Sequence, residues 1–336
     1  MLELTDRGLY CSRGDFYIDP WYPVPRAVVT HAHGDHCVPG CESYLVAEEG
    51  EAIYRTRLTE LAPLQLMTYG EEVSMMGVKI SLHPAGHILG SAQIRLEYHG
   101  EVWVISGDYK RTPDPTCPPF EPIKCDVFVT ESTFGLPIYR WPDQQDVFDQ
   151  INAWWRGNQE AGRASVLFGY PLGKAQRLIA GVDSSIGPIY THGQVEHLNL
   201  DYRKSGVELP PTIYVGTVEG RPDWSQALII APPSAAGSAW LRRFGDLSTG
   251  FASGWMRIRG TRRRRAIDRG FVLSDHVDWP SLIATIRETG AERVWVTHGY
   301  TPVVVKWLRE QGFDATAIPT RFTGEELYAS EEEEAE

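Results

Sequence analysis

Short runs of aliphatic and β-branched residues recur along the chain, and each is followed closely by a polar or titratable side chain. Runs this apolar are typical of strands that are buried on both faces. The runs are residues 27–30, 78–82, 102–106, 127–130, 271–274 and 294–297, and the residues that follow them are His31, His87, Asp108, Glu131, His276 and His298. A single sheet system can bring such strand-end side chains to one edge, so the pattern predicts an active site assembled from distant parts of the chain.

The stretch from about residue 140 to 262 has a different pattern. Expected helices at 144–156, 173–182 and 194–204 alternate there with expected strands at 165–168, 212–215 and 227–231. This alternation predicts a second α/β unit inserted into the first. The first pattern then returns, with helices expected at 279–288 and 303–311, each followed by a glycine. The predicted parts are residues 1–139, 140–262 and 263–328, followed by an acidic, disordered tail at 329–336.

Composition supports a globular protein, since 336 residues of which 42% are hydrophobic can bury a substantial core. No stretch approaches the roughly 18 apolar residues of a membrane span, and the N-terminus has no signal-peptide pattern, so we expect a cytoplasmic protein without a membrane partner.

The five cysteines form no CxxC pair, and we expect reduced, mostly buried thiols. A role for Cys37 and Cys41 beside the histidines is left open.

Charge is segregated along the chain. The net charge of −12 argues weakly against a nucleic-acid partner, but five of the negative charges lie in the tail. A cluster of arginines comprises Arg257, Arg259, Arg262, Arg263, Arg264, Arg265 and Arg269. Guanidinium groups bind phosphate in a bidentate way, and local charge outweighs net charge within a Debye length of about 8 Å. We therefore expect the arginines to contact phosphates, with a solvated charge run as the alternative.

The segment His31-Ala-His33-Gly-Asp35-His36 brings four potential metal ligands into six residues. Burying three imidazoles and a carboxylate is costly unless a cation compensates, so a metal centre is a better explanation than a polar surface loop. Alternation along the segment can direct His31 and His33 to one cation, while Asp35 and His36 turn toward a second. Two cations about 3.5 to 4 Å apart need a bridging oxygen and further ligands. The later strand-end residues His87, Asp108 and His298 are candidates.

Taken together, these residues resemble the metallo-β-lactamase superfamily over residues 1 to about 135 and about 265 to 325. The resemblance rests on the HxHxDH segment, on His87 in Pro-Ala-Gly-His, on Asp108 in Ser-Gly-Asp and on His298 in Val-Thr-His-Gly. It implies an α/β fold, the αββα sandwich. It also implies a ligand set: His31, His33 and His87 for one metal, Asp35, His36 and His298 for the other, with Asp108 bridging.

Three further features resemble the β-CASP nuclease branch, which includes ribonuclease J, RNA 3′-end-processing endonucleases and Artemis-type DNA nucleases. They are Glu131 in Val-Thr-Glu-Ser-Thr, His276 in Ser-Asp-His, and the inserted unit with Gly-Lys-Ala-Gln-Arg-Leu at 173–178. The short length and the segment Trp-Met-Arg-Ile-Arg-Gly-Thr-Arg-Arg-Arg-Arg at 255–265 look like bacterial ligase-associated DNA exonucleases. That group is linked with ATP-dependent DNA ligases and helicases, which are therefore expected partners beside DNA.

We accordingly expect a two-metal DNA exonuclease that acts in repair, with zinc favoured over manganese by the nitrogen and oxygen ligands. The expected catalytic residues are Asp35, Asp108, His276 and Glu131. His276 is expected near the scissile phosphate, with Glu131 accepting its other ring N–H.

Several alternatives and minor assignments stay open. An RNA exo- or endonuclease, a non-catalytic nucleic-acid-binding subunit and a small-ester or thioester hydrolase are the other functions considered. Asp278 is expected to cap a helix and Asp275 to accept a hydrogen bond from a metal-bound imidazole. Trp255 either stacks on a base or packs at the domain junction. The remaining histidines receive no functional role: His83, His99, His192 and His197.

Overall fold

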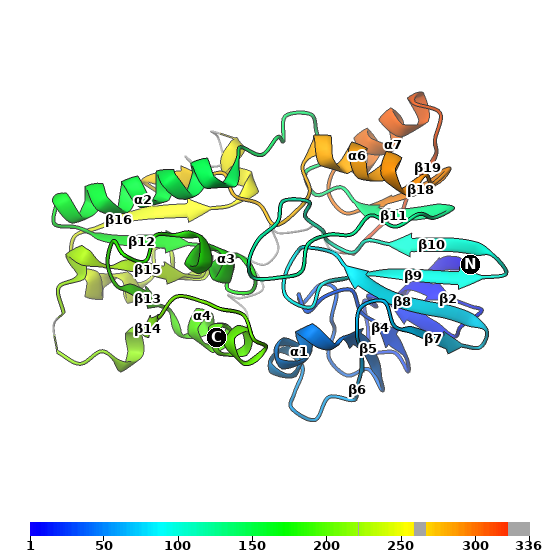
Figure 1. The fold of residues 1–336 in the computed structure, drawn as a ribbon, viewed down its shortest axis with the longest axis horizontal. Helices are drawn as coiled ribbons and strands as arrows, with labels where there is room; N and C mark the ends of the chain where they lie inside the picture. The colour runs from blue at the N-terminus through cyan, green and yellow to red at the C-terminus, as the bar shows by residue number, and fades with distance from the viewer. Residues whose placement is uncertain (221, 259–266, 322–336) are drawn as a thin grey trace. The chain divides into compact units, whose positions relative to one another are not determined.

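The computed structural model describes residues 1–220, 222–258 and 267–321, which form two compact units (Figure 1). The first unit contains Met1–Arg140 and the segment that begins at His276, and the second contains Trp141–Asp275. The sequence placed the second boundary at residue 262. The inserted unit instead runs on to Asp275, because the strand at Arg269–Phe271 pairs with the sheet of that unit. The acidic tail lies outside the described residues.

The first unit is built on two sheets. In spatial order, the six-stranded sheet contains β1 (Leu2–Thr5), β2 (Gly8–Cys11), β3 (Phe16–Ile18), β4 (Ala27–Val28), β5 (Tyr44–Ala47) and β6 (Leu64–Met67). The seven-stranded sheet contains β19 (Asp314–Ala317), β18 (Arg293–Thr297), β11 (Val127–Glu131), β10 (Glu101–Ile105), β9 (Ala92–Tyr98), β8 (Val78–Pro84) and β7 (Glu72–Met75). In the parallel pair β11 and β18, Glu131 lies opposite Thr297, so two of the expected site segments end side by side.

A shared core lies between these two sheets. Val28 and Leu45 of the six-stranded sheet pack in one cluster with Ile80, Ile94 and Val129 of the seven-stranded sheet. The helices α6 (Trp279–Thr289) and α7 (Thr301–Glu310) contribute to a separate core with side chains of β11 and β18. A short helix, α1 (Glu51–Arg57), follows β5 and the 3₁₀ turn η1 (Glu48–Gly50). The αββα fold is thereby confirmed. The segments that carry the expected site residues follow strands of different sheets.

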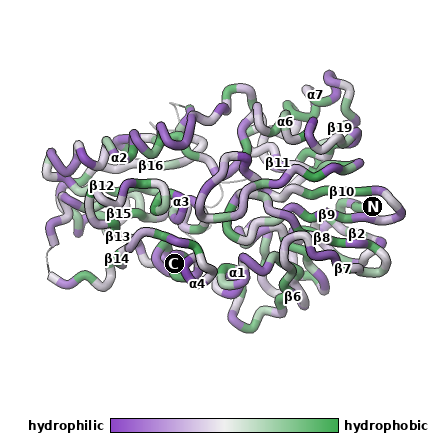
Figure 2. Tube along the Cα trace, viewed as in Figure 1, coloured by the Kyte–Doolittle hydropathy of each residue, from purple (hydrophilic) through white to green (hydrophobic). Residues whose placement is uncertain are grey.

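The second unit has one sheet, and all its pairings are parallel. Its strands are, in spatial order, β14 (Ile213–Tyr214), β13 (Ile189–Thr191), β15 (Leu228–Ala231), β12 (Ala164–Phe168), β16 (Leu247–Ala252) and β17 (Arg269–Phe271). The helices α2 (Gln144–Glu160), α3 (Lys174–Gly181) and α4 (Gly193–Lys204) share one core with these strands, as expected for an inserted α/β unit. Hydrophilic residues are frequent along α2 in Figure 2, in keeping with a helix that buries only one side.

Irregular segments contribute to a second core of the inserted unit. They contain the short 3₁₀ helices η2 (Val215–Thr217), η3 (Trp224–Gln226), η4 (Pro233–Ala235), η5 (Ala239–Phe244) and η6 (Gly254–Arg257). Phe244 and Met256 pack there with Val166 and Ile229, and Trp255 packs at the margin of this cluster. A packing role therefore accounts for Trp255 without a bound base.

All five cysteines are free, and four of them are buried. Within the ranges described here, no helix combines the length and the apolar character that crossing a membrane requires.

Candidate metal centre

The HxHxDH segment forms a tight loop, separated from the end of β4 by two residues. The backbone N–H groups of His36 and Cys37 both donate to the carbonyl oxygen of His33, at 3.1 and 2.9 Å, so the chain turns back on itself. His31, Asp35 and His36 are buried, whereas His33 is half-buried. The turn keeps four potential ligands within one loop, and their side chains meet residues from other strands.

The Asp108 loop approaches this segment closely because of a glycine. Gly107 has a φ of 56°, and a Cβ atom built on it would lie 2.6 Å from Cβ of Thr30. Only a glycine fits both this left-handed conformation and the narrow space. The close approach places the Asp108 carboxylate beside the histidines that follow Thr30.

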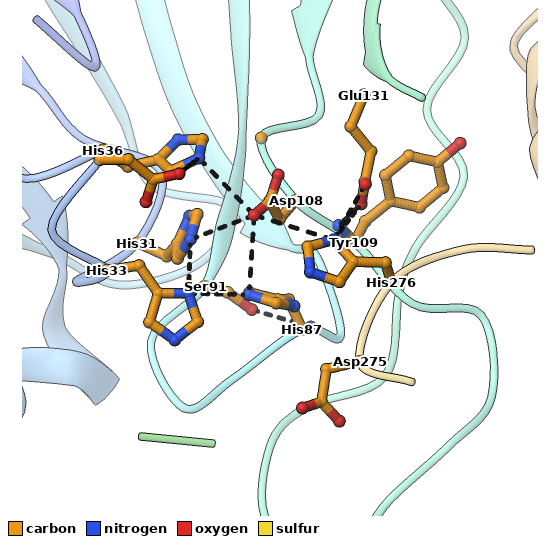
Figure 3. Close-up of polar contacts among 12 residues, drawn as sticks. His31, His33, His36, His87, Ser91, Asp108, Tyr109, Glu131, Asp275 and His276 are labelled. Carbon is orange, nitrogen blue, oxygen red and sulfur yellow. Dashed lines mark hydrogen bonds and ion pairs between the residues drawn. The ribbon is translucent and has the colours of Figure 1, made fainter. Parts of the chain in front are cut away.

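Three imidazoles and a carboxylate form the first group of potential ligands. Nδ1 of His33 lies 3.1 Å from Nε2 of His31 and 3.1 Å from Nε2 of His87, and Oδ2 of Asp108 lies 3.6 and 3.9 Å from the same two Nε2 atoms. Two nitrogens bound to one tetrahedral zinc are about 3.3 Å apart, so this spacing fits a shared cation. Figure 3 shows these rings turned toward Asp108.

Asp35, His36 and His298 form the second group. Nε2 of His36 lies 3.6 Å from Oδ2 of Asp35 and 3.6 Å from Oδ2 of Asp108, and the rings of His36 and His298 stack at 5.2 Å between centroids. His298 itself has a φ of 54°, directly after β18. The Asp108 oxygen is thus close to both groups, as a bridging ligand must be.

Two buried atoms of the site have no hydrogen-bond partner within the described ranges, namely Nε2 of His36 and Oδ1 of Asp108. Leaving a buried polar atom unsatisfied costs about 1–3 kcal/mol, and more for a charged group. A cation would satisfy both atoms. The donor set of imidazole and carboxylate, without thiolate, therefore fits divalent metals in both groups.

The charges of the side chains alone are poorly balanced in this site. Burial lowers the pKa of His36, but the carboxylates of Asp35, Asp108 and Asp19 outweigh burial and raise that pKa to about 10. Burial, together with the neighbouring imidazoles, holds the pKa of His31 well below its usual value. Burial also raises the pKa of Asp108 to about 7, although the charge of His36 opposes the shift. Bound cations would favour the neutral imidazoles and the ionised carboxylates.

Asp19, which was not identified from the sequence, contacts His36 of the second group through the ring nitrogen Nδ1. Its Oδ2 lies 2.8 Å from Nδ1 of His36, and its oxygens accept from the backbone N–H and the hydroxyl of Thr30 at 2.8 and 2.6 Å. The contact to Nδ1 leaves Nε2 of His36 facing the other ligands. Asp19 directly follows β3, so its position after a short strand was the available signal.

Glu131 and His276 form a buried pair beside Asp108 (Figure 3). Nδ1 of His276 lies 2.9 Å from Oε2 of Glu131, and the backbone N–H of Tyr109 donates to Oε1 at 2.9 Å. Burial raises the pKa of Glu131, but the nearby His276 and these hydrogen bonds outweigh it, so the pKa is lowered and the carboxylate stays ionised. Oδ2 of Asp108 is 3.8 Å from Nδ1 of His276, which puts the pair next to the ligand groups.

Asp275, Asp278 and the described arginines of the cluster lie outside the two ligand groups. The Asp275 carboxylate pairs with Lys174 at 2.6 Å and Arg177 at 2.9 Å, instead of the expected imidazole, within the inserted unit. Asp278 caps α6 as expected, accepting from the backbone N–H of Ser281. Of the arginine cluster, Arg257 is exposed and the Arg269 guanidinium lies over the ring of Phe271. The remaining members lie outside the described residues: Arg259, Arg262, Arg263, Arg264 and Arg265.

Comparisons with known proteins give partial matches, and no family model matches the chain. A probable DNA ligase of Opitutus terrae is 32% identical over 316 residues, which is 93% of this chain and 30% of that protein. An RNase J-like protein of Methanocaldococcus jannaschii is 26% identical over 229 residues, which is 59% of this chain and 54% of the relative. Cleavage and polyadenylation specificity factor 73 of Drosophila melanogaster is 32% identical over 123 residues, which is 36% of this chain and 18% of that protein.

This chain therefore matches 54% of the length of one of these curated relatives and 30% or less of the other two. Among solved structures, a protein of unknown function from Enterococcus faecalis has a TM-score of 0.57 with 11% sequence identity, over 87% of this chain and 78% of that one. At this identity the likeness concerns the fold alone.

Proposed function

This chain belongs to the β-CASP branch of the metallo-β-lactamase superfamily, and from that premise we propose that it is a metal-dependent DNA exonuclease. One observation carries the proposal. Oδ2 of Asp108 lies 3.6 Å from Nε2 of His31 in one ligand group and 3.6 Å from Nε2 of His36 in the other. A carboxylate shared by two such groups is typical of two-metal phosphodiesterases.

The ligand roles follow from the two groups. His31, His33 and His87 would hold one cation, Asp35, His36 and His298 would hold the second, and Asp108 would be shared by both. Two divalent cations held there would supply a nucleophilic water at neutral pH and would neutralise charge on the phosphoryl oxygens. Zinc suits imidazole and carboxylate ligands best, and manganese is compatible with them.

In this proposal His276 acts on the leaving group. Glu131 holds Nδ1 of His276 at 2.9 Å and so orients the ring, whose proposed role is to donate a proton to the leaving oxygen or to hold the phosphate. Glu131 keeps the ring in one orientation, which suits a group that must deliver a proton to one particular atom. Arg257 and the arginines outside the described residues would bind phosphates of the substrate.

The choice of DNA rests on the relative that covers most of this chain, since the name of that relative is probable DNA ligase. An ATP-dependent DNA ligase, with a helicase, is for the same reason the proposed partner, and repair is the proposed process. The RNase J-like relative and an endoribonuclease of Neurospora crassa, 29% identical over 129 residues, favour RNA as the alternative substrate. The complete set of potential ligands argues against a non-catalytic subunit.

Timed digestion of end-labelled, single- and double-stranded DNA and of matched RNA tests the proposal on protein whose metal content has been measured. We expect about two metal ions per chain and progressive shortening of DNA from an end. Asp108→Ala should abolish hydrolysis, while Asp126→Asn, which alters a carboxylate that accepts from the backbone N–H of Val102, should not. Faster cleavage of RNA would overturn the DNA assignment, and full activity of Asp108→Ala would overturn the two-metal mechanism.

A further inference from the structure

Helix α1 places an arginine over the loop that carries the proposed ligands. Arg57 is the last residue of α1, and a Cβ atom built on Gly34 would lie only 3.1 Å from Nη2 of Arg57. Gly34 stands between His33 and Asp35, which belong to different ligand groups. The guanidinium group therefore lies against the backbone of the loop, at the point where the absence of a side chain leaves room for it.

Arg57 is exposed and is not committed to a partner. In the part of the chain that the structure describes, its side chain makes no hydrogen bond and no ion pair. The contrast with Arg55, two residues earlier on the same helix, is clear. The Arg55 guanidinium binds the Glu51 carboxylate at 2.8 Å and the carbonyl oxygen of Glu60 at 2.7 Å. Arg55 stabilises α1 and the turn after it, whereas the five N–H donors of Arg57 remain available.

A free guanidinium beside a metal loop has a use when the substrate is a polyanion. The chain carries a net charge of −12, so a nucleic-acid strand needs local positive charge to approach the ligand groups. Guanidinium groups bind phosphate oxygens in a bidentate way, which fixes position as well as charge. We propose that Arg57 binds a backbone phosphate of the substrate, one next to the phosphate that is cleaved. This inference rests on the proposed nuclease function and adds a substrate-binding residue to it.

The assignment to a neighbouring phosphate follows from the position of Arg57. Its contact is with the loop at Gly34, whereas Glu131 and His276 surround Asp108, where the reaction is proposed to occur. A contact made equally before and during the reaction lowers KM without changing kcat. The competing explanation is structural, since a cation at the end of a helix interacts favourably with the helix dipole. That role would affect the stability of α1 but not the binding of substrate.

Kinetics of the metal-loaded protein separate these roles. We would compare wild type with Arg57→Ala, Arg57→Lys and the matched control Arg55→Gln, on whichever short oligonucleotide the wild type cleaves. Arg57→Ala should raise KM about ten-fold with kcat nearly unchanged, because a hydrogen-bonded charge contact is lost. The plot of log kcat/KM against log salt concentration has a negative slope, and Arg57→Ala should make this slope shallower by about 0.7 to 0.9. A change of that size corresponds to the loss of one phosphate contact. Arg57→Lys should keep the slope and raise KM less.

The outcomes distinguish the phosphate contact, a structural role of Arg57 and the nuclease activity itself. Arg55→Gln should change neither KM nor the salt slope, and metal content should be equal in all variants. An unchanged KM and slope in Arg57→Ala would overturn the phosphate contact while leaving the nuclease proposal intact. Equal loss of kcat in Arg57→Ala and Arg57→Lys, with KM constant, would assign Arg57 to the structure of the loop instead. A wild type inactive on both DNA and RNA would sink the nuclease proposal and this inference with it.

Discussion

The carboxylate of Asp19 lies 2.8 Å from Nδ1 of His36, on the side of the ring away from Nε2. Asp19 has a φ of 42°, a left-handed conformation that aspartate tolerates better than most residues. The same carboxylate binds the backbone N–H and the hydroxyl of Thr30, directly before the HxHxDH loop. One residue thus fixes both the start of the loop and the orientation of a proposed ligand.

Asp19→Asn should therefore weaken metal binding without unfolding the protein. Asparagine also tolerates the left-handed conformation, but it removes the negative charge that holds the His36 ring. Loss of such a contact behind a ligand typically lowers metal affinity 10- to 100-fold, which titration with zinc would measure. Asp15→Asn is the control, because Asp15 is exposed, has a φ of 54° and pairs with Tyr10 and Arg26, which belong to none of the ligand groups. Equal affinity in wild type and Asp19→Asn would contradict this role.

Stabilisation by zinc should depend on pH because of Asp108. Without metal, burial raises the pKa of this carboxyl to about 7, against its usual 3.8. Its contribution to the stability of the metal-free fold is thus fully present below pH 3.8 and is lost as the pH rises toward 7. Zinc needs the ionised form, so the increase in Tm on adding zinc should be larger at pH 8 than at pH 6. An increase that is the same at both pH values would argue against Asp108 as a ligand.

His276→Ala should lower kcat while both metal ions remain bound. A positioned general acid contributes typically 10²- to 10⁴-fold, so kcat should fall by about that factor. The matched control is His83→Ala, since the His83 ring lies 3.0 Å from the Ser81 hydroxyl in β8 and belongs to none of the ligand groups. Metal analysis and single-turnover kinetics would check both variants. If His276→Ala kept the wild-type kcat, the imidazole would have no part in proton transfer.

Gly107→Ala should destabilise the first unit and displace Asp108. Two costs add at this position. The new methyl group would lie only 2.6 Å from Cβ of Thr30, and alanine would have to adopt a positive φ. Gly70→Ala measures the cost of the positive φ alone, because Gly70 has a φ of 81° and no atom lies within 4 Å of an added Cβ. We expect about 1 kcal/mol of lost unfolding free energy for Gly70→Ala and at least about 1 kcal/mol more for Gly107→Ala. Equal losses by urea denaturation would show that the loop can move aside.

Much of the candidate site could be predicted, because ligand type and strand ends are local features. The apolar runs before His31, His87, Asp108 and His298 marked where each strand would deliver its side chain, and the four residues do lie in the two ligand groups. Which sheet each strand joins could not be predicted. The runs that form β4 and β8 each precede a histidine of the ligand groups, but the two strands belong to different sheets, since pairing depends on register and on the path of the connecting loops.

The sequence by itself determined the chemistry of this protein: imidazoles and carboxylates spaced along the chain, and an α/β insertion with its own hydrophobic periodicity. Only the tertiary structure decided which side chains these residues contact. Asp19 behind His36, Asp275 paired with Lys174, and Arg57 against Gly34 each join residues that no periodicity relates. Such contacts depend on where separate elements pack against one another, and that is set by the burial of whole surfaces rather than by any local run of residues.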